Sequence, residues 1–416
     1  MIAVVGCGRV GLSLALCLAA RGERVLGVET DPRVRAALGE GRMPFADDFI
    51  SGLLHLAWGR TFTLAEDLAS AVAVCDSFVI ALGTPLGAGF LPEQEPLSRV
   101  VLSIIKVAAP GLGRRPEPPL IVLRSTVTPG TTDGLIRTAE RELGLLLGRD
   151  FLLAVCPERT LEGHSEELLE LPQIIGTRED RSAGAAAAVF GRLGVELVAT
   201  GLVEAELAKL YDNAHRYVSF ALSNELMMVA RAHGARPHEA LRAANHNYKR
   251  GGIPGPGYAS GPCLSKDGFL LGGRLPAVGL LLTGWRVNES LPEYFIQQIE
   301  AIRPLTRSTV LGLAFKADSD DSRNSLGLKL VELLRVRGVE TVAHDPFVGG
   351  AGVTSDLERA LRGAEEVFVT VPHQAYRALP WRELGRMVQP GCIVADPWST
   401  WGQDDVVVEL AGSKPR

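Results

Sequence analysis

The sequence predicts an α/β protein with two separate parallel sheets that are joined by a long helix. Short apolar runs alternate with helix-like repeats in the N-terminal half, and the same alternation returns near the C-terminus. One long helical pattern separates the two regions. Strands that alternate with helices typically form a parallel sheet that helices cover on both faces. The 416 residues exceed what one ordinary core holds, so we expect more than one domain.

The first sheet is expected from five short apolar runs, at residues 2–5, 24–28, 77–82, 120–123 and 152–155. A helix is expected between the first two runs, because residues 10–21 carry apolar side chains at helical spacing and end at Gly22.

The central helix is expected over residues 201–234, where apolar residues recur every three or four positions without a proline. A second helix is expected over 237–244, and the glycine-rich stretch 251–261 is expected to be a loop. The second sheet is expected from runs at 309–313, 341–343, 366–371 and 392–395, with a helix at 326–337.

Composition restricts the function classes. The net charge is −5 and no long basic run is present, so binding to nucleic acid or to an anionic membrane gains no electrostatic support. The six cysteines are not arranged as C-x-x-C, which favours neither a zinc site nor a disulfide scaffold, and no metal site is expected. The N-terminus lacks a basic signal-peptide region and no run is long enough to span a bilayer, so we expect a cytoplasmic protein.

A cofactor site is predicted at the first turn of the chain. Gly6-Cys7-Gly8-Arg9-Val10-Gly11 fits G-x-G-x-x-G between a predicted strand and a predicted helix. The glycines let backbone N–H groups and the helix N-terminus approach a pyrophosphate, so Gly6, Gly8, Arg9, Val10 and Gly11 are expected to bind it. Glu29 ends the second strand, where a carboxylate accepts ribose hydroxyls and repels a 2′-phosphate. We therefore expect NAD rather than NADP.

Further motifs follow in order along the chain. They are Gly83-Thr84-Pro85, Arg124-Ser125-Thr126-Val127-Thr128-Pro129-Gly130-Thr131-Thr132, Cys156-Pro157-Glu158-Arg159, Glu206-Leu207-Ala208-Lys209-Leu210 with Asn213, Gly255-Pro256-Gly257, Cys263-Leu264-Ser265-Lys266-Asp267, Leu311-Gly312-Leu313-Ala314-Phe315-Lys316 with Arg323, and His344-Asp345-Pro346. In this order, and over essentially the whole length, they resemble the UDP-glucose/GDP-mannose dehydrogenase family.

The resemblance implies two Rossmann-like domains joined by a central long helix and helical segment. The expected divisions are an NAD-binding Rossmann domain at 1–200, a central helical and dimerisation domain at 201–304, and a C-terminal Rossmann-like domain at 305–416 for a nucleotide sugar. It also implies a homodimer, a UDP-sugar as substrate and an active site in the cleft. The expected reaction is the NAD-dependent oxidation of the sugar C6 alcohol to the uronic acid.

This reaction needs two hydride transfers and one water. A cysteine thiolate can add to the intermediate aldehyde to give a thiohemiacetal, which passes on a second hydride and becomes a thioester that water cleaves. Cys263 follows a glycine-rich loop and precedes Lys266 and Asp267, and a nearby cation favours the thiolate. A lone cysteine is more often a core residue, but this context and the resemblance together predict Cys263 as the nucleophile.

The other catalytic residues are expected on several elements. Lys209 and Asn213 are four residues apart and share one helix face. There they would stabilise a developing alkoxide, and Lys209 would take the alcohol proton directly or through water. The resemblance implies that Glu158 positions or activates the hydrolytic water. It also implies that Thr126 anchors a water near the nicotinamide, and that Asp267 assists the lysine and the water.

The resemblance implies binding roles as well. Beyond the glycine turn, the residues expected to bind the cofactor are Thr84, Thr126, Lys266 and Arg323. The residues expected to bind the substrate are Glu158, Arg159, Glu162, Lys209, Asn213, Gly257, Tyr258 and Lys316. Some family members complete the site with an arginine of the partner subunit, and Arg323 is the candidate here.

The sugar is left open by mixed signals. Arg159 is similar to the branch that acts on UDP-N-acetylhexosamines such as UDP-N-acetylmannosamine or UDP-N-acetylglucosamine, whereas Glu162 and Lys266 are similar to the UDP-glucose branch. Ala259 and Ser260 replace two glycines of the usual loop. Two other functions remain as alternatives, a two-electron hydroxyacid-type dehydrogenase and a non-catalytic nucleotide-sugar-binding protein.

Overall fold

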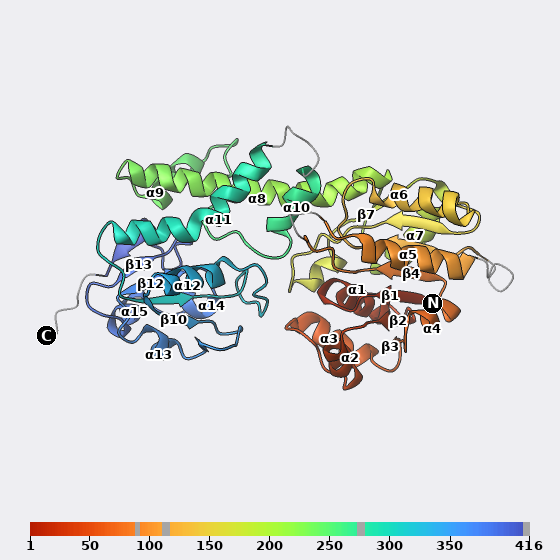
Figure 1. The fold of residues 1–416 in the computed structure, drawn as a ribbon, viewed down its shortest axis with the longest axis horizontal. Helices are drawn as coiled ribbons and strands as arrows, with labels where there is room; N and C mark the ends of the chain where they lie inside the picture. The colour runs from red at the N-terminus through yellow and green to blue at the C-terminus, as the bar shows by residue number, and fades with distance from the viewer. Residues whose placement is uncertain (88–91, 110–116, 273–278, 411–416) are drawn as a thin grey trace. The chain divides into compact units, whose positions relative to one another are not determined.

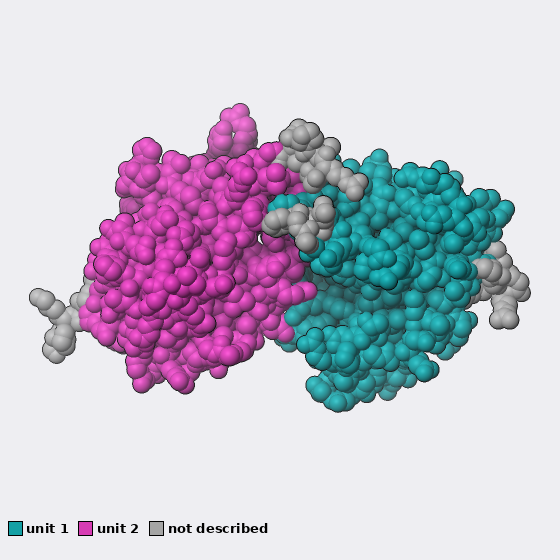
Figure 2. Space-filling model, in the orientation of Figure 1, with its two compact units in different colours: residues 1–212, 269–273 teal, residues 213–268, 274–416 magenta. Residues whose placement is uncertain are grey.

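The computed structural model describes residues 1–87, 92–109, 117–272 and 279–410. The chain forms two compact units, which Figure 2 colours separately. Unit 1 contains Met1–Asp212 and a short segment that begins at Phe269, and unit 2 contains Asn213–Gly268 and the C-terminal part of the chain. The division into three domains that was expected from the sequence stays a prediction.

In the described residues, unit 1 contains an eight-stranded sheet with the order β3-β2-β1-β4-β5-β6-β7-β8. Its strands are β1 (Ile2–Val5), β2 (Val25–Val28), β3 (Phe62–Leu64), β4 (Ser77–Ile80), β5 (Leu120–Leu123), β6 (Leu152–Val155), β7 (Gln173–Thr177) and β8 (Leu197–Thr200). β6 and β7 are antiparallel and the other paired neighbours run parallel. The first six strands have the order of a Rossmann sheet.

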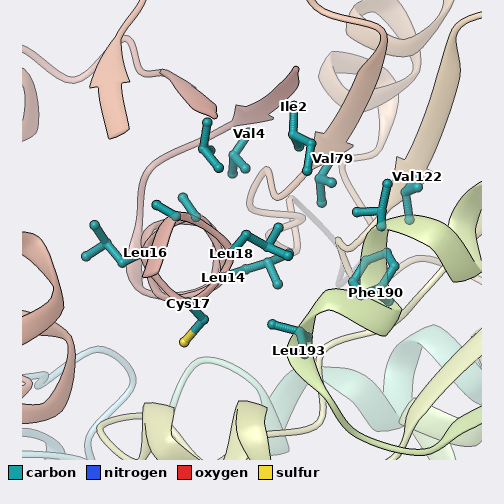
Figure 3. Packing of buried hydrophobic residues seen from close by; sticks show 14 of the residues in the cluster. Ile2, Val4, Leu14, Leu16, Cys17, Leu18, Val79, Val122, Phe190 and Leu193 are labelled. Carbon is teal, nitrogen blue, oxygen red and sulfur yellow. The ribbon is translucent and has the colours of Figure 1, made fainter. Parts of the chain in front are cut away.

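Helices cover both faces of this sheet because successive strand residues point to opposite sides. The helices are α1 (Arg9–Ala20), α2 (Pro32–Gly39), α3 (Asp48–Ala57), α4 (Leu68–Val74), α5 (Glu95–Ala108), α6 (Thr131–Thr138) and α7 (Asp180–Phe190). Ile2 and Val4 pack with residues of α1, α3 and α7, and Figure 3 shows this cluster around Leu14 and Leu18. Ala3 and Val5 pack with α4, α5 and α6 on the other face.

The predicted central helix is present as α8 (Leu202–Ala232), a single helix of 31 residues that Figure 1 shows without a break. The boundary between the two units lies inside it. Near its start, the Glu206 carboxylate accepts hydrogen bonds from the N–H groups of Gly130 and Thr132, at 2.6 and 2.8 Å. This carboxylate satisfies N–H groups at the beginning of α6, which fixes the start of α8 to the Thr126 motif.

Unit 2 contains, in the described residues, a six-stranded sheet with the order β11-β10-β9-β12-β13-β14. The strands are β9 (Arg307–Leu311), β10 (Glu340–His344), β11 (Val353–Thr354), β12 (Glu366–Val369), β13 (Ile393–Ala395) and β14 (Val407–Glu409). The helices are α9 (Pro237–Asn245), α11 (Gly279–Glu300), α12 (Leu326–Val336), α13 (Leu357–Leu361), α14 (Gln374–Arg377) and α15 (Trp381–Met387). Helix α10 (Leu264–Gly272) begins in unit 2, and its residues from Phe269 onward belong to unit 1. The order repeats the Rossmann order of unit 1, which confirms the predicted fold class.

A close glycine contact recurs in the two units. A Cβ on Gly11 would lie 1.8 Å from the carbonyl oxygen of Gly6, and a Cβ on Gly327 would lie 2.4 Å from that of Gly312. Gly6 and Gly312 each follow the first strand of their sheet and have φ of +92° and +97°. Unit 2 therefore has the same tight strand-to-helix packing, although a longer loop separates its two glycines.

Candidate active site

The glycine turn of unit 1 has the geometry of a phosphate-binding turn. Gly8 is the residue before α1, and among the described residues no atom beyond its chain neighbours lies within 4 Å of the place that a Cβ on Gly8 would occupy. A ligand can therefore approach the N-terminus of α1 closely, where the helix dipole favours a pyrophosphate. Val10 is exposed in the first turn of this helix.

Glu29 is held beside this turn. Its carboxylate accepts hydrogen bonds from the backbone N–H groups of Cys7 and Asp31, both at 2.8 Å. These bonds fix the carboxylate at the end of β2, the position that the prediction assigns to the cofactor ribose.

Discrimination against NADP is the expected consequence. A 2′-phosphate beside the Glu29 carboxylate would place like charges together at a cost of several kcal/mol, so we expect NADPH to bind about 100-fold or more weakly than NADH. Fluorescence titration of both nucleotides measures the two dissociation constants. Glu29→Gln should narrow the ratio, whereas Glu23→Gln, which changes a surface carboxylate paired with Arg192, should leave it unchanged. Equal dissociation constants in the unaltered protein would refute the assignment.

Two neighbouring strand ends hold Thr84 and Thr126 together. The Thr84 hydroxyl donates to the carbonyl oxygen of Thr126 at 2.6 Å, and the Ser125 hydroxyl donates to the carbonyl oxygen of Leu82 at 2.7 Å. Both loops lie at the carboxyl edge of the parallel sheet, where ligands of such folds bind.

Glu158 lies behind these loops and is paired with Arg124. The guanidinium Nη2 and Nε of Arg124 donate to Oε2 of Glu158 at 2.7 and 3.2 Å, and both side chains are buried. Burial alone would raise the pKa of Glu158, but the charge of Arg124 and a hydrogen bond from the Thr160 N–H outweigh it and lower the pKa. Glu158 is therefore an anion at neutral pH.

The remaining candidates of unit 1 form ion pairs or lie near Glu158. Arg159 pairs with Asp212 at 2.8 Å, and Arg9 pairs with Glu162 at 3.2 Å. Lys209 is half-buried on α8 and acts electrostatically on Glu158. Unit 1 thus brings Glu158 under the influence of Lys209, and joins the predicted substrate residue Glu162 to the glycine turn.

In unit 2, Cys263 is exposed and directly precedes α10. Its carbonyl oxygen accepts the N–H groups of Lys266 and Asp267, at 3.1 and 2.9 Å, so Cys263 begins the hydrogen-bonding of the helix. A position at a helix N-terminus favours a negatively charged sulfur.

A buried polar network adjoins this helix start. The Asn213 side-chain amide donates to Oδ2 of Asp267 at 2.6 Å, and the Lys266 ammonium lies 3.1 Å from Oδ1 of the same carboxylate. Asn213 and Asp267 are 4% and 1% exposed. The structure therefore brings together three predicted site residues from α8 and α10.

The loop of Gly257 and Tyr258 is fixed from behind. The Asn224 side chain accepts from the Gly257 N–H at 2.9 Å and donates to its carbonyl oxygen at 3.1 Å, while a Cβ on Gly257 would overlap the ring of Trp398. The Tyr258 side chain is buried against Phe295, so a ligand contact at this position would come from the backbone.

Lys316 and Arg323 lie in the loop between β9 and α12. Asp345 holds the beginning of this loop, since its carboxylate accepts the N–H groups of Leu313 and Ala314 at 2.6 and 3.0 Å. Burial opposes ionisation of Asp345, but a hydrogen bond from His373 and the backbone N–H groups lower its pKa to about 2. Lys316 is half-buried, and the exposed Arg323 pairs with Asp321 at 2.9 Å.

Three family models match nearly the whole chain. The NAD binding domain of the UDP-glucose/GDP-mannose dehydrogenase family matches residues 1–193, its central domain 203–287 and its UDP binding domain 309–403. The chain belongs to the UDP-glucose/GDP-mannose dehydrogenase family. It is accordingly an NAD-dependent nucleotide-sugar dehydrogenase, which confirms the resemblance, the cofactor and the reaction class predicted from the sequence.

Individual relatives are similar over the same extent. UDP-N-acetyl-D-mannosamine dehydrogenase of Pyrococcus horikoshii is 31% identical over 94% of both chains. NDP-N-acetyl-D-galactosaminuronic acid dehydrogenase of Ralstonia solanacearum is 29% identical over 91% of this chain and 92% of its own. The structure of a UDP-glucose dehydrogenase from Pyrobaculum islandicum has a TM-score of 0.83 and 28% identity, and covers 95% of this chain and 93% of its own.

Sequence reasoning missed some residues that this dehydrogenase uses to hold the predicted site. Arg124 was named only as part of a motif, without a role, and Asn224 was not named, although each makes close polar contacts to a candidate residue. A charged residue directly after the apolar strand 120–123 was a usable signal for Arg124, because arginine is rarely buried without a carboxylate partner. No local signal marks Asn224.

Proposed function

We propose that this dehydrogenase oxidises the C6 alcohol of a UDP-sugar to the carboxylate in two hydride transfers, with Cys263 as the covalent nucleophile. The observation that supports this most directly is the exposed thiol of Cys263 at the start of α10, beside the buried network of Asn213, Asp267 and Lys266. A thiol in this position can form a thiohemiacetal with the aldehyde and make the second hydride transfer possible.

The other roles follow the chemistry of the reaction. Lys209 and Asn213, one turn apart on α8, stabilise the C6 oxygen as charge develops, and Lys209 accepts the alcohol proton directly or through water. Thr126 anchors the water that cleaves the thioester, and Glu158 positions or activates it. Asp267 orients Lys266 and Asn213. The glycine turn with Arg9, Glu29, Thr84, Lys266 and Arg323 binds NAD. Arg159, Glu162, Gly257, Tyr258 and Lys316 bind the UDP-sugar.

The number of NADH molecules formed per limiting substrate tests the proposal. We expect two NADH from one member of a panel of UDP-glucose, UDP-GlcNAc, UDP-ManNAc and GDP-mannose. One NADH per substrate would favour the two-electron dehydrogenase instead. Binding of a nucleotide sugar without any NADH from the panel would favour the non-catalytic binding protein.

For the sugar we propose a UDP-N-acetylhexosamine, with UDP-glucose as the alternative. Two relatives whose names specify an N-acetylated sugar are 29–31% identical to this chain over more than nine-tenths of its length. Arg159 after Glu158 agrees with this branch. Glu162 and Lys266, which are similar to the UDP-glucose branch, keep UDP-glucose in the panel.

We also propose a cytoplasmic homodimer. The exposed side of α8 carries the apolar side chains of Tyr211, Leu222 and Val229, which are 58%, 49% and 54% exposed. Apolar side chains repeated along one helix are typical of an interface. Light scattering that gives a single-chain mass at micromolar concentration would contradict the dimer. None of the helices in the described part of the chain is long and apolar enough to cross a membrane.

A further inference from the structure

Arg124 anchors a buried polar cluster that the reaction scheme above does not use. It directly follows β5, and its side chain is completely buried. Besides the two bonds to Glu158, its Nη1 donates to the Gln173 side-chain oxygen at 2.9 Å and to the Cys156 carbonyl oxygen at 3.0 Å. Its guanidinium also lies over the ring of Phe190, 5.6 Å from the centroid. The guanidinium is thus contacted by the residue that follows β6, by a residue of β7 and by one of α7.

The other oxygen of Glu158 is held by the backbone. Oε1 accepts the N–H groups of Arg159 and Thr160 at 2.7 and 2.8 Å. Each carboxylate oxygen therefore accepts two hydrogen bonds, and the planar group has a single orientation. Nε and Nη2 of Arg124 both donate to Oε2, while the backbone holds Oε1, and a lysine ammonium, which is a single point charge, does not present two donors in this fixed arrangement.

We propose that Arg124 is a positioning residue for thioester hydrolysis. It holds the carboxylate of Glu158 in the orientation in which Glu158 activates the hydrolytic water. This inference rests on the proposed function, in which Glu158 takes part in that step. Arg124 itself touches neither substrate nor cofactor in this assignment.

Hydrolysis of the thioester consumes one water and no other reactant. The water oxygen forms a bond to the thioester carbonyl carbon, and the carbon–sulfur bond breaks. The sulfur leaves as the Cys263 thiolate and the sugar carries a carboxylate. The two protons of the water are released, and no electrons are exchanged. The first proton goes to Oε2 of Glu158, which gives up its longest hydrogen bond, the one from Nε of Arg124 at 3.2 Å, to accept it.

The charges around Glu158 decide how this step depends on pH. Arg124 after β5, Lys209 on α8, and the thiols of Cys156 and Cys17 are the titratable or charged groups that act on it. Burial raises the pKa of Glu158 and Arg124 lowers it. A weaker pairing would therefore raise this pKa, so that Glu158 becomes protonated and stops accepting protons as the pH falls.

The test compares Arg124→Lys with Glu158→Gln and with Arg149→Lys, a control at an exposed arginine of the same unit that pairs with Asp150. We expect Arg124→Lys to form two NADH per subunit in a burst and then to turn over roughly 10- to 100-fold more slowly, a part of what a positioned base contributes. Mass spectrometry of the quenched enzyme should show the thioester on Cys263. The acidic limb of the kcat profile should move to higher pH, and Arg149→Lys should change none of these readouts.

A role of Arg124 in folding alone would give different results. The inference is overturned by a folded Arg124→Lys variant that shows no thioester and an unmoved acidic limb. If that variant does not fold, Gln173→Met keeps the ion pair but removes the second anchor of the guanidinium, and it should give the same burst with a smaller loss. A folded Gln173→Met enzyme that hydrolyses normally overturns the inference instead.

Failure of the proposed function is a separate outcome. A Glu158→Gln enzyme that accumulates no thioester removes Glu158 from hydrolysis, and the inference about Arg124 fails with it. A Glu158→Gln enzyme that accumulates the thioester, beside an Arg124→Lys enzyme that does not, leaves the proposed function intact and refutes the inference alone.

Discussion

A Cys263→Ser enzyme is expected to lose four-electron turnover almost completely. The serine hydroxyl is a far weaker nucleophile toward the aldehyde than a thiolate at the start of α10, so the second hydride transfer and the thioester are both compromised. Removal of the nucleophile from a cooperating set costs a factor on the order of 10³–10⁶ in kcat. NADH formed per substrate in single turnover measures the loss, and a stalled covalent adduct is visible by mass.

Controls separate this chemical loss from a loss of folding. Cys392 is buried in unit 2 in an apolar cluster with Val388 and Leu410 and has no role in the proposed reaction, so Cys392→Ala should lower the melting temperature while NADH per substrate stays at two. Cys263 is exposed, so Cys263→Ser should leave the melting temperature and the NADH dissociation constant unchanged. Full four-electron turnover by Cys263→Ser would exclude it as the nucleophile.

Much of the fold was predictable because its signals are local. The runs 2–5, 120–123 and 152–155 are strands with the predicted bounds, since each is a continuous apolar segment that is buried on both faces of a parallel sheet. The uninterrupted helical spacing of 201–234 predicted α8 to within two residues at its end.

The elements that were missed lack such signals. β8 contains only four residues, none of which is buried, and β3 contains only three, so neither gives a long pattern in the sequence. α11 contains Pro292 and two glycines, residues that ordinarily argue against a helix, and burial of Phe295 and Ile299 outweighs them. The secondary structure of these segments therefore depends on contacts that form only in the folded chain.

The candidate site was predictable to a different degree. The glycine turn and Glu29 follow from a motif with a physical meaning, whereas the roles of Lys209, Glu158 and Cys263 came from resemblance. What the sequence could not reveal is which side chains hold them. The pairs Arg124–Glu158 and Asn213–Asp267 join residues 34 and 54 positions apart, and only the folded chain makes such partners visible.

Asp267→Asn is expected to weaken both the stability of unit 2 and the reaction. The mutation removes the negative charge that the buried Asn213 amide and Lys266 ammonium share, and leaves the ammonium without its partner. Breaking a buried ion pair from one side costs about 3–5 kcal/mol of unfolding free energy. In the proposed reaction Asp267 also orients Asn213, which stabilises the developing charge on the C6 oxygen, so kcat should fall by a further factor on the order of 10²–10³. Thermal unfolding and steady-state NADH formation measure the two effects.

A swapped pair distinguishes structure from chemistry at this position. Asn213→Asp combined with Asp267→Asn restores an amide–carboxylate hydrogen bond between α8 and α10 but moves the charge to α8. We expect this double variant to recover part of the melting temperature lost by Asp267→Asn, while kcat stays low because neither group then stands where the reaction needs it. Recovery of kcat together with stability would mean that Asp267 only holds the two helices together. Asp267 would then not be a catalytic residue, and the reaction would depend on Lys209 and Cys263 without it.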